Sequence, residues 1–338
     1  MRRRLLRPPR AVAVLVLVLA IVAAALWLVP SNQYLILPDP AHPVAPLVKV
    51  KGERASRDGG GIYFVDVIVR RAKLFERLFP SIHSGAALVP ESRINPPGVS
   101  DEARRRADLR EMRRSQSVAA AVALRALGYR VVARPVGVLV SQVFHGTPAA
   151  GKLEPGNVIV AVDGLPVRTP AELRRIMRRH RPGDRVRFTV KTERRQQVVV
   201  LRTVADPDRP SRAVVGIVID QAADIRLPVR VAIDAGGIGG PSAGLAFALD
   251  VMEELGRDVD RGYKVAATGA IALDGSVGEI GAVRQKVEGA RQSDVDVFLV
   301  PAGENAEEAR RHAAGLRVIA VKSFPQALQA LATLPRRE

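Results

Sequence analysis

The N-terminal end of the chain carries the longest apolar run in the sequence. Residues 11–29, AVAVLVLVLAIVAAALWLV, hold no polar side chain, and five arginines precede them in MRRRLLRPPR. A helix of this length spans about 29 Å, close to the hydrocarbon thickness of a bilayer. With the arginines on the cytoplasmic side, residues 1–30 predict a single-pass anchor in the cell membrane that leaves the rest of the chain outside the cytoplasm. A signal peptide cleaved after the small residues 23–25 is the alternative, but the apolar run continues past them.

Polar and apolar residues alternate less regularly over the next hundred residues. Prolines at four positions between 38 and 46 predict an extended linker over residues 31–58. The run GGGIYFVDVIVR predicts a strand over 61–70, and acidic residues after Ser100 predict a helix that ends at Gly128. The strand has no partner nearby in the sequence. We therefore expect residues 59–133 to pack on the C-terminal domain, with the intervening region inserted between them.

Short apolar strands separated by turn residues dominate residues 134–205. Thr169-Pro170-Ala171-Glu172 has the pattern of a capping box and opens the one long helix expected there. The ordered run GVLVSQV, then GTPAAG, then PGNVIVAVDG resembles a bacterial PDZ domain. The resemblance implies a groove for an extended peptide or a free C-terminus. Backbone N–H groups of Val136, Gly137 and Val138 would hold the terminal carboxylate, and the strand edge through Leu139 to Val140 would take the peptide as an added strand. A PDZ-shaped spacer with an empty groove is the alternative.

A glycine-rich loop surrounds one serine further along the chain. The stretch GGIGGPSAGLAFALDVMEELG places Ser242 after Gly240 and in the first turn of an apolar helix, with Pro241 as a suitable first helical residue. Free N–H groups and the positive helix end could stabilise negative charge there, and glycines would let a substrate main chain approach. These are requirements of a nucleophile beside an oxyanion hole. The loop has neither a P-loop nor a dinucleotide-binding pattern, and a tight turn with a capping serine is the simpler alternative.

A lysine on a second helix supplies a possible base. In YKVAATGAIALDGSVGEIGAVRQKVEGARQ, Lys286 lies among the apolar positions Val283 and Val287 on one helical face. Packing against that face could desolvate the amine and lower its pKa far enough for general-base catalysis. A solvated surface lysine is the ordinary alternative.

These two motifs together resemble the proteolytic domain of Lon proteases, the serine–lysine peptidase family S16. GPSAG, then Thr268-Gly269, then the pattern ending at Lys286 carry the resemblance, which covers residues 211–335. It implies Ser242 as nucleophile, Lys286 as general base and Thr268 as the residue that orients the lysine. The whole arrangement resembles the membrane-anchored PDZ–Lon proteins of the YlbL-like group, and a hexameric ring is implied by resemblance alone. The chain lacks a Walker A motif, so we expect ATP-independent action, and Gly239 stands where many Lon enzymes carry an acid.

Composition narrows the remaining alternatives. The chain has a formal net charge of +18 and no cysteine, which excludes disulfides and Cys/His zinc sites. The basic runs hold no interleaved aromatic residues, so contact with anionic lipid fits the charge better than nucleic acid. Of the five histidines only His312 falls in the C-terminal domain, on an arginine-rich helix, which makes a Ser-His-Asp triad a poor fit. We expect no metal and no cofactor.

The sequence therefore predicts an α+β and α/β protein with three parts: a transmembrane helix, a β-rich PDZ domain and a Lon-type domain with a mixed sheet. Its predicted function is ATP-independent, membrane-anchored serine endopeptidase, with a PDZ domain that recruits or gates protein substrates. A membrane-anchored PDZ adaptor with an inert Lon-like domain is the first alternative. A basic protein that binds lipid or nucleic acid surfaces is the second.

Overall fold

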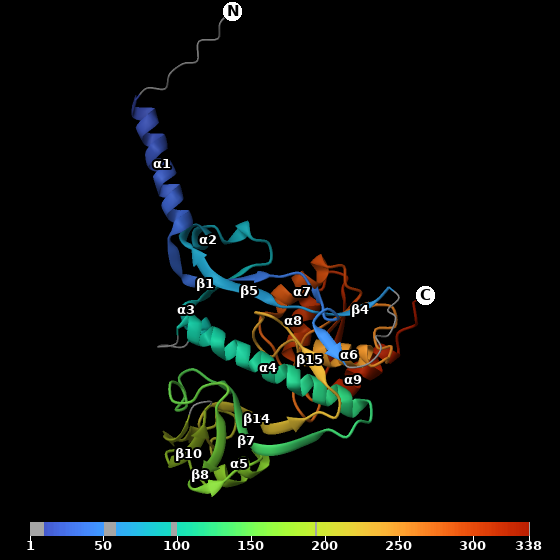
Figure 1. Ribbon diagram of the computed structural model, residues 1–338. Coiled ribbons are helices and arrows are strands. Elements are labelled where there is room, and N and C mark those ends of the chain that lie inside the picture. Colours follow the sequence, from blue (N-terminus) through green and yellow to red (C-terminus); the bar gives the residue numbers. More distant parts are fainter. Residues whose placement is uncertain (1–9, 51–58, 96–99, 193–194, 338) are drawn as a thin grey trace, which may run out of the picture.

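The computed structural model describes residues 10–50, 59–95, 100–192 and 195–337. The apolar N-terminal run forms a helix, α1 (Arg10–Leu28), that points away from the body of the protein (Figure 1). At its base the ring of Trp27 stacks on that of Phe75, with 5.5 Å between centroids. Within the part of the chain that the structure describes, no helix is both long enough and apolar enough to cross a membrane. The predicted transmembrane helix over residues 11–29 is therefore not supported.

The C-terminal domain is built on a five-stranded sheet in the order β2-β4-β16-β19-β20. The last four strands run parallel and β2 is antiparallel to β4, so the predicted mixed sheet is present. The strands are β2 (His42–Pro43), β4 (Gly61–Phe64), β16 (Lys264–Ala267), β19 (Val297–Pro301) and β20 (Arg317–Val321).

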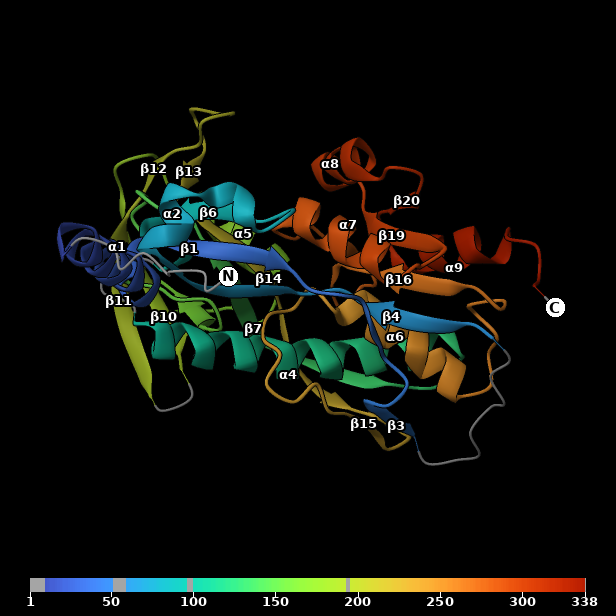
Figure 2. The ribbon, with the colours of Figure 1, turned by 90° about the horizontal axis from the view of Figure 1, so that it is seen from above.

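Helices cover both faces of this sheet (Figure 2). Successive side chains of a strand point to opposite faces, and because these strands are apolar at successive positions, both faces need a cover. Val265 and Leu299 belong to one core with three helices, α4 (Asp101–Ala126), α6 (Gly244–Glu254) and α9 (Phe324–Ala332). Their neighbours Ala266 and Phe298 belong to a second core with α7 (Val283–Gln292) and α8 (Glu304–His312). Ser242, which precedes α6, and Lys286 of α7 therefore belong to segments on opposite faces of the sheet.

Two predictions for the N-terminal third are wrong. The described part of the predicted linker is built into the fold: Tyr34, Leu35, Val44 and Val48 are all buried. Residues 51–58 of that linker lie outside the described residues. The single strand expected over 61–70 is divided at residues 65–66 into β4 and β5 (Val67–Lys73), which belong to different sheets. Alternation of apolar residues indicates a strand but cannot locate a break within it. Residues 65–66 at this break lie beside the candidate active site.

The remaining N-terminal elements pack against parts of the C-terminal domain. A three-stranded antiparallel sheet has β1 (Pro30–Pro38) between β5 and β6 (Ala87–Pro90), and β3 (Val48–Val50) pairs with β15 (Val231–Ile233). The N-terminal segment also contains three short helical elements, which are α2 (Leu74–Leu78), a 3-10 turn at Pro80–Ile82 and α3 (Glu91–Ile94). The hydroxyl of Tyr34 donates to Asp101, which ties β1 to the first turn of α4. The N-terminal segment therefore positions α4.

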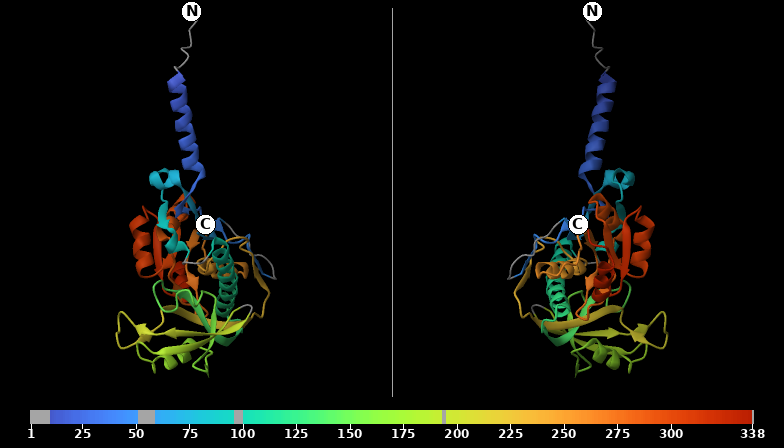
Figure 3. Two further views of the ribbon diagram at one scale, coloured as in Figure 1. Left: turned by 90° about the vertical axis from the view of Figure 1, so that its left-hand side faces the viewer. Right: turned by 90° about the vertical axis from the view of Figure 1, so that its right-hand side faces the viewer.

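The β-rich domain lies at the opposite end of the body from α1 (Figure 3). Its main sheet has the order β11-β10-β8-β7-β14, with β9 beside β8. The strands are β7 (Val132–Val143), β8 (Val158–Val162), β9 (Leu165–Pro166), β10 (Arg185–Lys191), β11 (Gln196–Arg202) and β14 (Ile217–Arg226), and β12 (Val204–Ala205) pairs with β13 (Ala213–Val214). The predicted capping box is confirmed: Thr169 Oγ1 accepts from the Glu172 N–H at 3.2 Å at the start of α5 (Pro170–Met177).

Candidate active site

The glycine-rich loop carries Ser242 to the wall of a cleft that Lys286 also lines. Ser242 lies in a turn just before α6, because the helix begins at Gly244, three residues after the predicted start at Pro241. Gly240 has a φ of +85°, in the left-handed region that favours glycine. The Gly240 N–H donates to the carbonyl of Asp108 on α4 at 2.8 Å. This bond fixes the loop to a helix that is distant in sequence.

Two further contacts between α4 and the loop hold Ser242 in place. Ser115 Oγ donates to the carbonyl of Pro241 at 3.0 Å. Gly239 packs so closely on α4 that a Cβ there would lie 2.7 Å from the Cβ of Asp108. Where the resemblance to Lon enzymes leads one to expect an acid, the structure therefore needs a residue without a side chain.

Lys286 and Ser242 are in direct contact. The Lys286 Nζ lies 2.7 Å from the Ser242 Oγ and 3.1 Å from the Thr268 Oγ1. Thr268 in turn donates its hydroxyl to the carbonyl of Ser242 at 3.2 Å. The structure thus brings together the three side chains that the sequence marked as nucleophile, base and support, from three separate segments of the chain.

The amine of Lys286 is removed from water, because the residue is only 3% exposed. Val283, Val287 and Ala290 on the same helix pack into the core against Val65 and Ala266. Burial lowers the pKa of Lys286 from its ordinary value to about 8, and the charge of Asp66 opposes this shift. An amine with such a pKa is partly neutral near pH 7 and can accept a proton.

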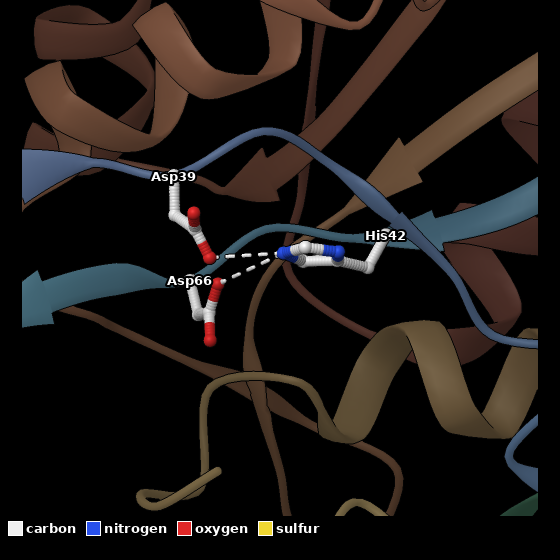
Figure 4. Close-up of side chains that lie close together, drawn as sticks. All are labelled: Asp39, His42 and Asp66. Carbon is white, nitrogen blue, oxygen red and sulfur yellow. Dashed lines mark hydrogen bonds and ion pairs between the residues drawn. The ribbon is translucent and has the colours of Figure 1, made fainter.

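Asp66 is a site residue that the sequence analysis missed. It sits at the break between β4 and β5 and lines the same cleft as Lys286 and Ser242. Figure 4 shows its carboxylate beside that of Asp39 and the ring of His42, whose Nε2 lies 2.9 Å from Asp39 Oδ2 and 3.8 Å from Asp66 Oδ1. Burial, together with a hydrogen bond to Asp39, raises the pKa of Asp66 to about 6. An acid thus faces the lysine from the N-terminal segment.

Asp39, His42 and Asp66 also place one ligand atom each within 4.8 Å of one another, which is a spacing that a cation could bridge. All three are partly exposed, and His42 already contacts both carboxylates. We interpret the cluster as an ion-pair network beside the lysine. The only sequence signal for it was a lone aspartate inside an otherwise apolar strand pattern.

Comparison with known families agrees with this architecture. Residues 125–202 match the family described as PDZ domain, and residues 213–331 match the Lon protease (S16) C-terminal proteolytic domain. The chain joins a PDZ domain to a Lon-type proteolytic domain. The second match contains Ser242, Thr268 and Lys286, and the first contains β7 to β11 with α5.

Individual relatives match only parts of the chain. Lon protease 2 of Bacillus subtilis (strain 168) is 33% identical over 114 residues, which are 34% of this chain and 19% of that protein. The chain thus spans about a fifth of the length of this curated relative. Among solved structures, the PDZ domain of an SdrC-like protein from Listeria monocytogenes is 25% identical, with a TM-score of 0.24, over 25% of this chain and 87% of that one. A protein from Geobacillus thermodenitrificans is 36% identical, with a TM-score of 0.23, over 24% of this chain and 94% of that one.

The predicted peptide edge of the PDZ domain is wrong. Val138 pairs with Ile159 of β8 on one side and with Gln221 of β14 on the other, and Leu139 is likewise paired on both sides. Both edges of β7 at Val136, Gly137, Val138 and Leu139 are thus in or beside existing ladders, and no edge there is free for an added strand. The sequence could not reveal this, because β14 lies beyond the region that the PDZ-like motifs cover.

On this side of β7 the PDZ sheet ends at β14 instead, and β11 forms its other edge. A groove runs between β14 and α5, lined by Leu173, Met177 and Arg178 from the helix side and by Gly216 and Ile217 from the strand. We call it the terminal groove. It combines an apolar wall and positive charge with a strand edge, and the strand edge is the feature that the sequence analysis had assigned to β7.

Proposed function

We propose that this protein is an ATP-independent serine endopeptidase that acts through a Ser242–Lys286 dyad. The observation that carries the proposal is the 2.7 Å contact between a buried amine and the Ser242 hydroxyl. A lysine that served only the packing of α7 would not need its amine within hydrogen-bond distance of a serine in a glycine-rich loop. The matching Lon-type domain supports the same reaction class.

The neutral amine of Lys286 has one lone pair and two N–H groups. The lone pair takes the proton of Ser242 as its oxygen attacks the scissile carbonyl, while one N–H donates to Thr268. Lys286 then gives that proton to the leaving amine, which departs as the acyl-enzyme forms. Water repeats the cycle with the acyl group and regenerates the serine. Thr268 acts as a positioning residue because it fixes both the amine and the Ser242 carbonyl.

Two residues of the glycine-rich loop cannot supply an oxyanion donor. Pro241 has no N–H, and the Gly240 N–H is already used on the Asp108 carbonyl. The two residues therefore shape the loop and donate nothing. We propose the N–H of Ser242, at the turn into α6, as a donor to the developing charge.

The PDZ domain supplies substrate binding in this proposal. The terminal groove offers a strand edge for an extended peptide, and its arginines offer charge to a carboxylate. Protein substrates, rather than nucleic acid, fit this arrangement. A homo-oligomer remains a prediction that follows from the Lon-like resemblance.

The location also remains a proposal. We propose that residues 11–29 attach the protein to the cell membrane with the catalytic domains outside the cytoplasm. Support comes from the arginines before the run and from the large apolar side chains that α1 leaves exposed, such as Leu15, Leu17 and Leu19. Alkaline extraction and protease protection of intact cells would test it: release into the soluble fraction, or protection of the PDZ domain, would contradict it.

A serine-directed acylating probe tests the activity directly. Wild type should be labelled at Ser242, with the site established by peptide mass mapping, and should cleave an unfolded protein such as casein. Ser242→Ala should lose both labelling and cleavage while keeping its circular dichroism spectrum. Wild-type protein that is folded, unlabelled and inactive towards every unfolded substrate would favour the adaptor alternative.

A further inference from the structure

The terminal groove opens directly into the catalytic cleft. Both are lined by Phe144 just after β7, Arg174 of α5, and Val218 and Ile219 of β14. Beyond these shared residues the cleft continues along Asp220 and Gln221 to Ser242 and Lys286. A chain that lies on β14 can therefore pass from the groove to the serine of the same molecule without leaving the protein surface.

The backbone of β14 is available to a peptide over a short stretch only. The carbonyl of Gly216 faces β7, because it accepts the Phe144 N–H at 2.9 Å. Alternation along a strand then turns the backbone groups of Ile217 and Ile219 towards the free edge. At Gln221 the edge ends, because the carbonyl accepts the Arg114 guanidinium of α4 at 2.8 Å.

Arg114 thus forces a bound peptide off the sheet. The same guanidinium group holds Asp220 at 3.0 Å, which joins β14 firmly to α4. A peptide that pairs with Ile217 and Ile219 cannot continue beside Gln221. At this point the peptide would enter the catalytic cleft, which the loop of Ser242 also lines.

Charge sets the direction in which a peptide lies. Four arginines and two aspartates line the terminal groove. Eight carboxyl-bearing residues, five arginines and Lys286 line the cleft. The terminal carboxylate therefore belongs in the groove, near Arg178, and the preceding residues lead towards Ser242. Leu173, Met177 and Phe188 line the groove and suit an apolar last side chain.

We propose that the enzyme measures its cleavage site from the substrate's own C-terminus. An unfolded C-terminal segment with an apolar last residue binds the terminal groove, crosses at Ile219 and is cut at a fixed number of residues upstream by Ser242 of the same molecule. The products are a shortened protein and a short C-terminal peptide of constant length. This inference rests on the proposed function and adds to it the class of substrate and the position of the cut.

A peptide series with one repeating, cleavable sequence tests whether the cut is measured from the C-terminus. Members would differ in total length, in a free acid or an amide at the C-terminus, and in an apolar or acidic last residue. Mass spectrometry of the products should show a C-terminal fragment of one length throughout the free-acid series. Amidation, or an acidic last residue, should lower kcat/KM at least tenfold.

A matched pair of arginine variants separates the groove from general charge effects. Arg178→Glu should weaken cleavage of free-acid peptides by at least tenfold and should leave labelling of Ser242 by a small acylating probe, which does not need the groove, within about twofold. Arg179→Glu makes the same change on a residue outside the groove and should behave as wild type.

Two results would overturn the inference in distinguishable ways. Cuts at a constant distance from the N-terminus, or equal cleavage of amidated and free-acid peptides, would refute measurement from the C-terminus and leave the proposed peptidase activity standing. Wild-type enzyme that cleaves neither peptides nor casein would refute the proposed function, and the inference about the C-terminus with it.

Discussion

Lys286 Nζ lies 2.7 Å from Ser242 Oγ although 44 residues separate them in the chain. The contact is made inside the protein, where Lys286 is nearly inaccessible to water. Burying the charged form of this lysine costs stability, whereas its neutral form can act as a base. The first two predictions follow from these two effects.

Lys286→Met should remove activity and raise stability. Lowering the pKa from its ordinary value to about 8 corresponds to roughly 3 kcal/mol against the folded state near pH 7. Methionine fills a similar volume without that penalty. We expect cleavage below detection and a Tm higher by a few degrees in calorimetry. A variant that is inactive but less stable than wild type would show that burial of the amine does not destabilise the fold.

The dependence of activity on pH should follow the amine. The kcat/KM for a peptide should rise as pH increases through about 8, because only neutral Lys286 can take the serine proton. Stability should also rise with pH, from about 8 up to the ordinary lysine pKa, because over that range the unfolded chain binds the proton that the folded protein has lost. A kcat/KM that stays flat between pH 6 and pH 10, in a stopped assay with a fluorogenic peptide, would contradict the role of the lysine as base.

Asp66→Asn should move this activity profile towards lower pH. The negative charge of Asp66 favours protonated Lys286, so its removal lowers the pKa of the lysine further. More activity at neutral pH is therefore expected. Asp258→Asn removes a carboxylate that pairs with Arg336 outside the cleft and should leave the profile unchanged. A profile for Asp66→Asn that matches wild type would remove Asp66 from the site.

Thr268→Val should weaken the chemical step. Valine has nearly the same shape but leaves one N–H of the Lys286 amine without its acceptor, and it removes one of the two hydrogen bonds that the Ser242 carbonyl accepts, the other coming from the Gly269 N–H. An unsatisfied buried group costs about 1–3 kcal/mol, which predicts a fall of about 5- to 150-fold in kcat with little change in KM. Thr268→Ser should restore most of the rate. Equal loss in both variants would indicate a packing role only.

A pair of glycine variants should separate strain from function. Gly240 and Gly256 have φ values of +85° and +83°, and a Cβ added to either would meet no atom within 4 Å beyond its neighbours in the chain. Alanine should cost about 1–2 kcal/mol of stability at each position, measured by urea denaturation. Only Gly240→Ala should also reduce cleavage, because only that loop carries Ser242. Equal activity in the two variants would contradict the importance of the loop conformation.

The sequence predicted what local pattern can carry. Proline and glycine around Ser242, the helical face around Lys286 and the capping box at Thr169 are short-range signals, and the structure has the expected elements at or near each. Partners that meet through tertiary pairing were beyond reach. Asp66 faces Lys286 only because β4 and β5 separate, and β14 occupies the edge of β7 only because the chain returns there after the PDZ motifs. The period of the hydrophobic residues predicts that a segment is a strand, but it does not predict which other strand will pair with it.

The position of β4 in the middle of the catalytic sheet has a practical consequence. This strand lies between β2 and β16 and is contributed by residues 61–64, far ahead of the segment that resembles Lon proteases. A fragment expressed from residue 211 onwards would expose the edge of β16 and lose the helix that braces the serine loop. We expect such a fragment to be insoluble in recombinant expression, because the cut divides the catalytic sheet.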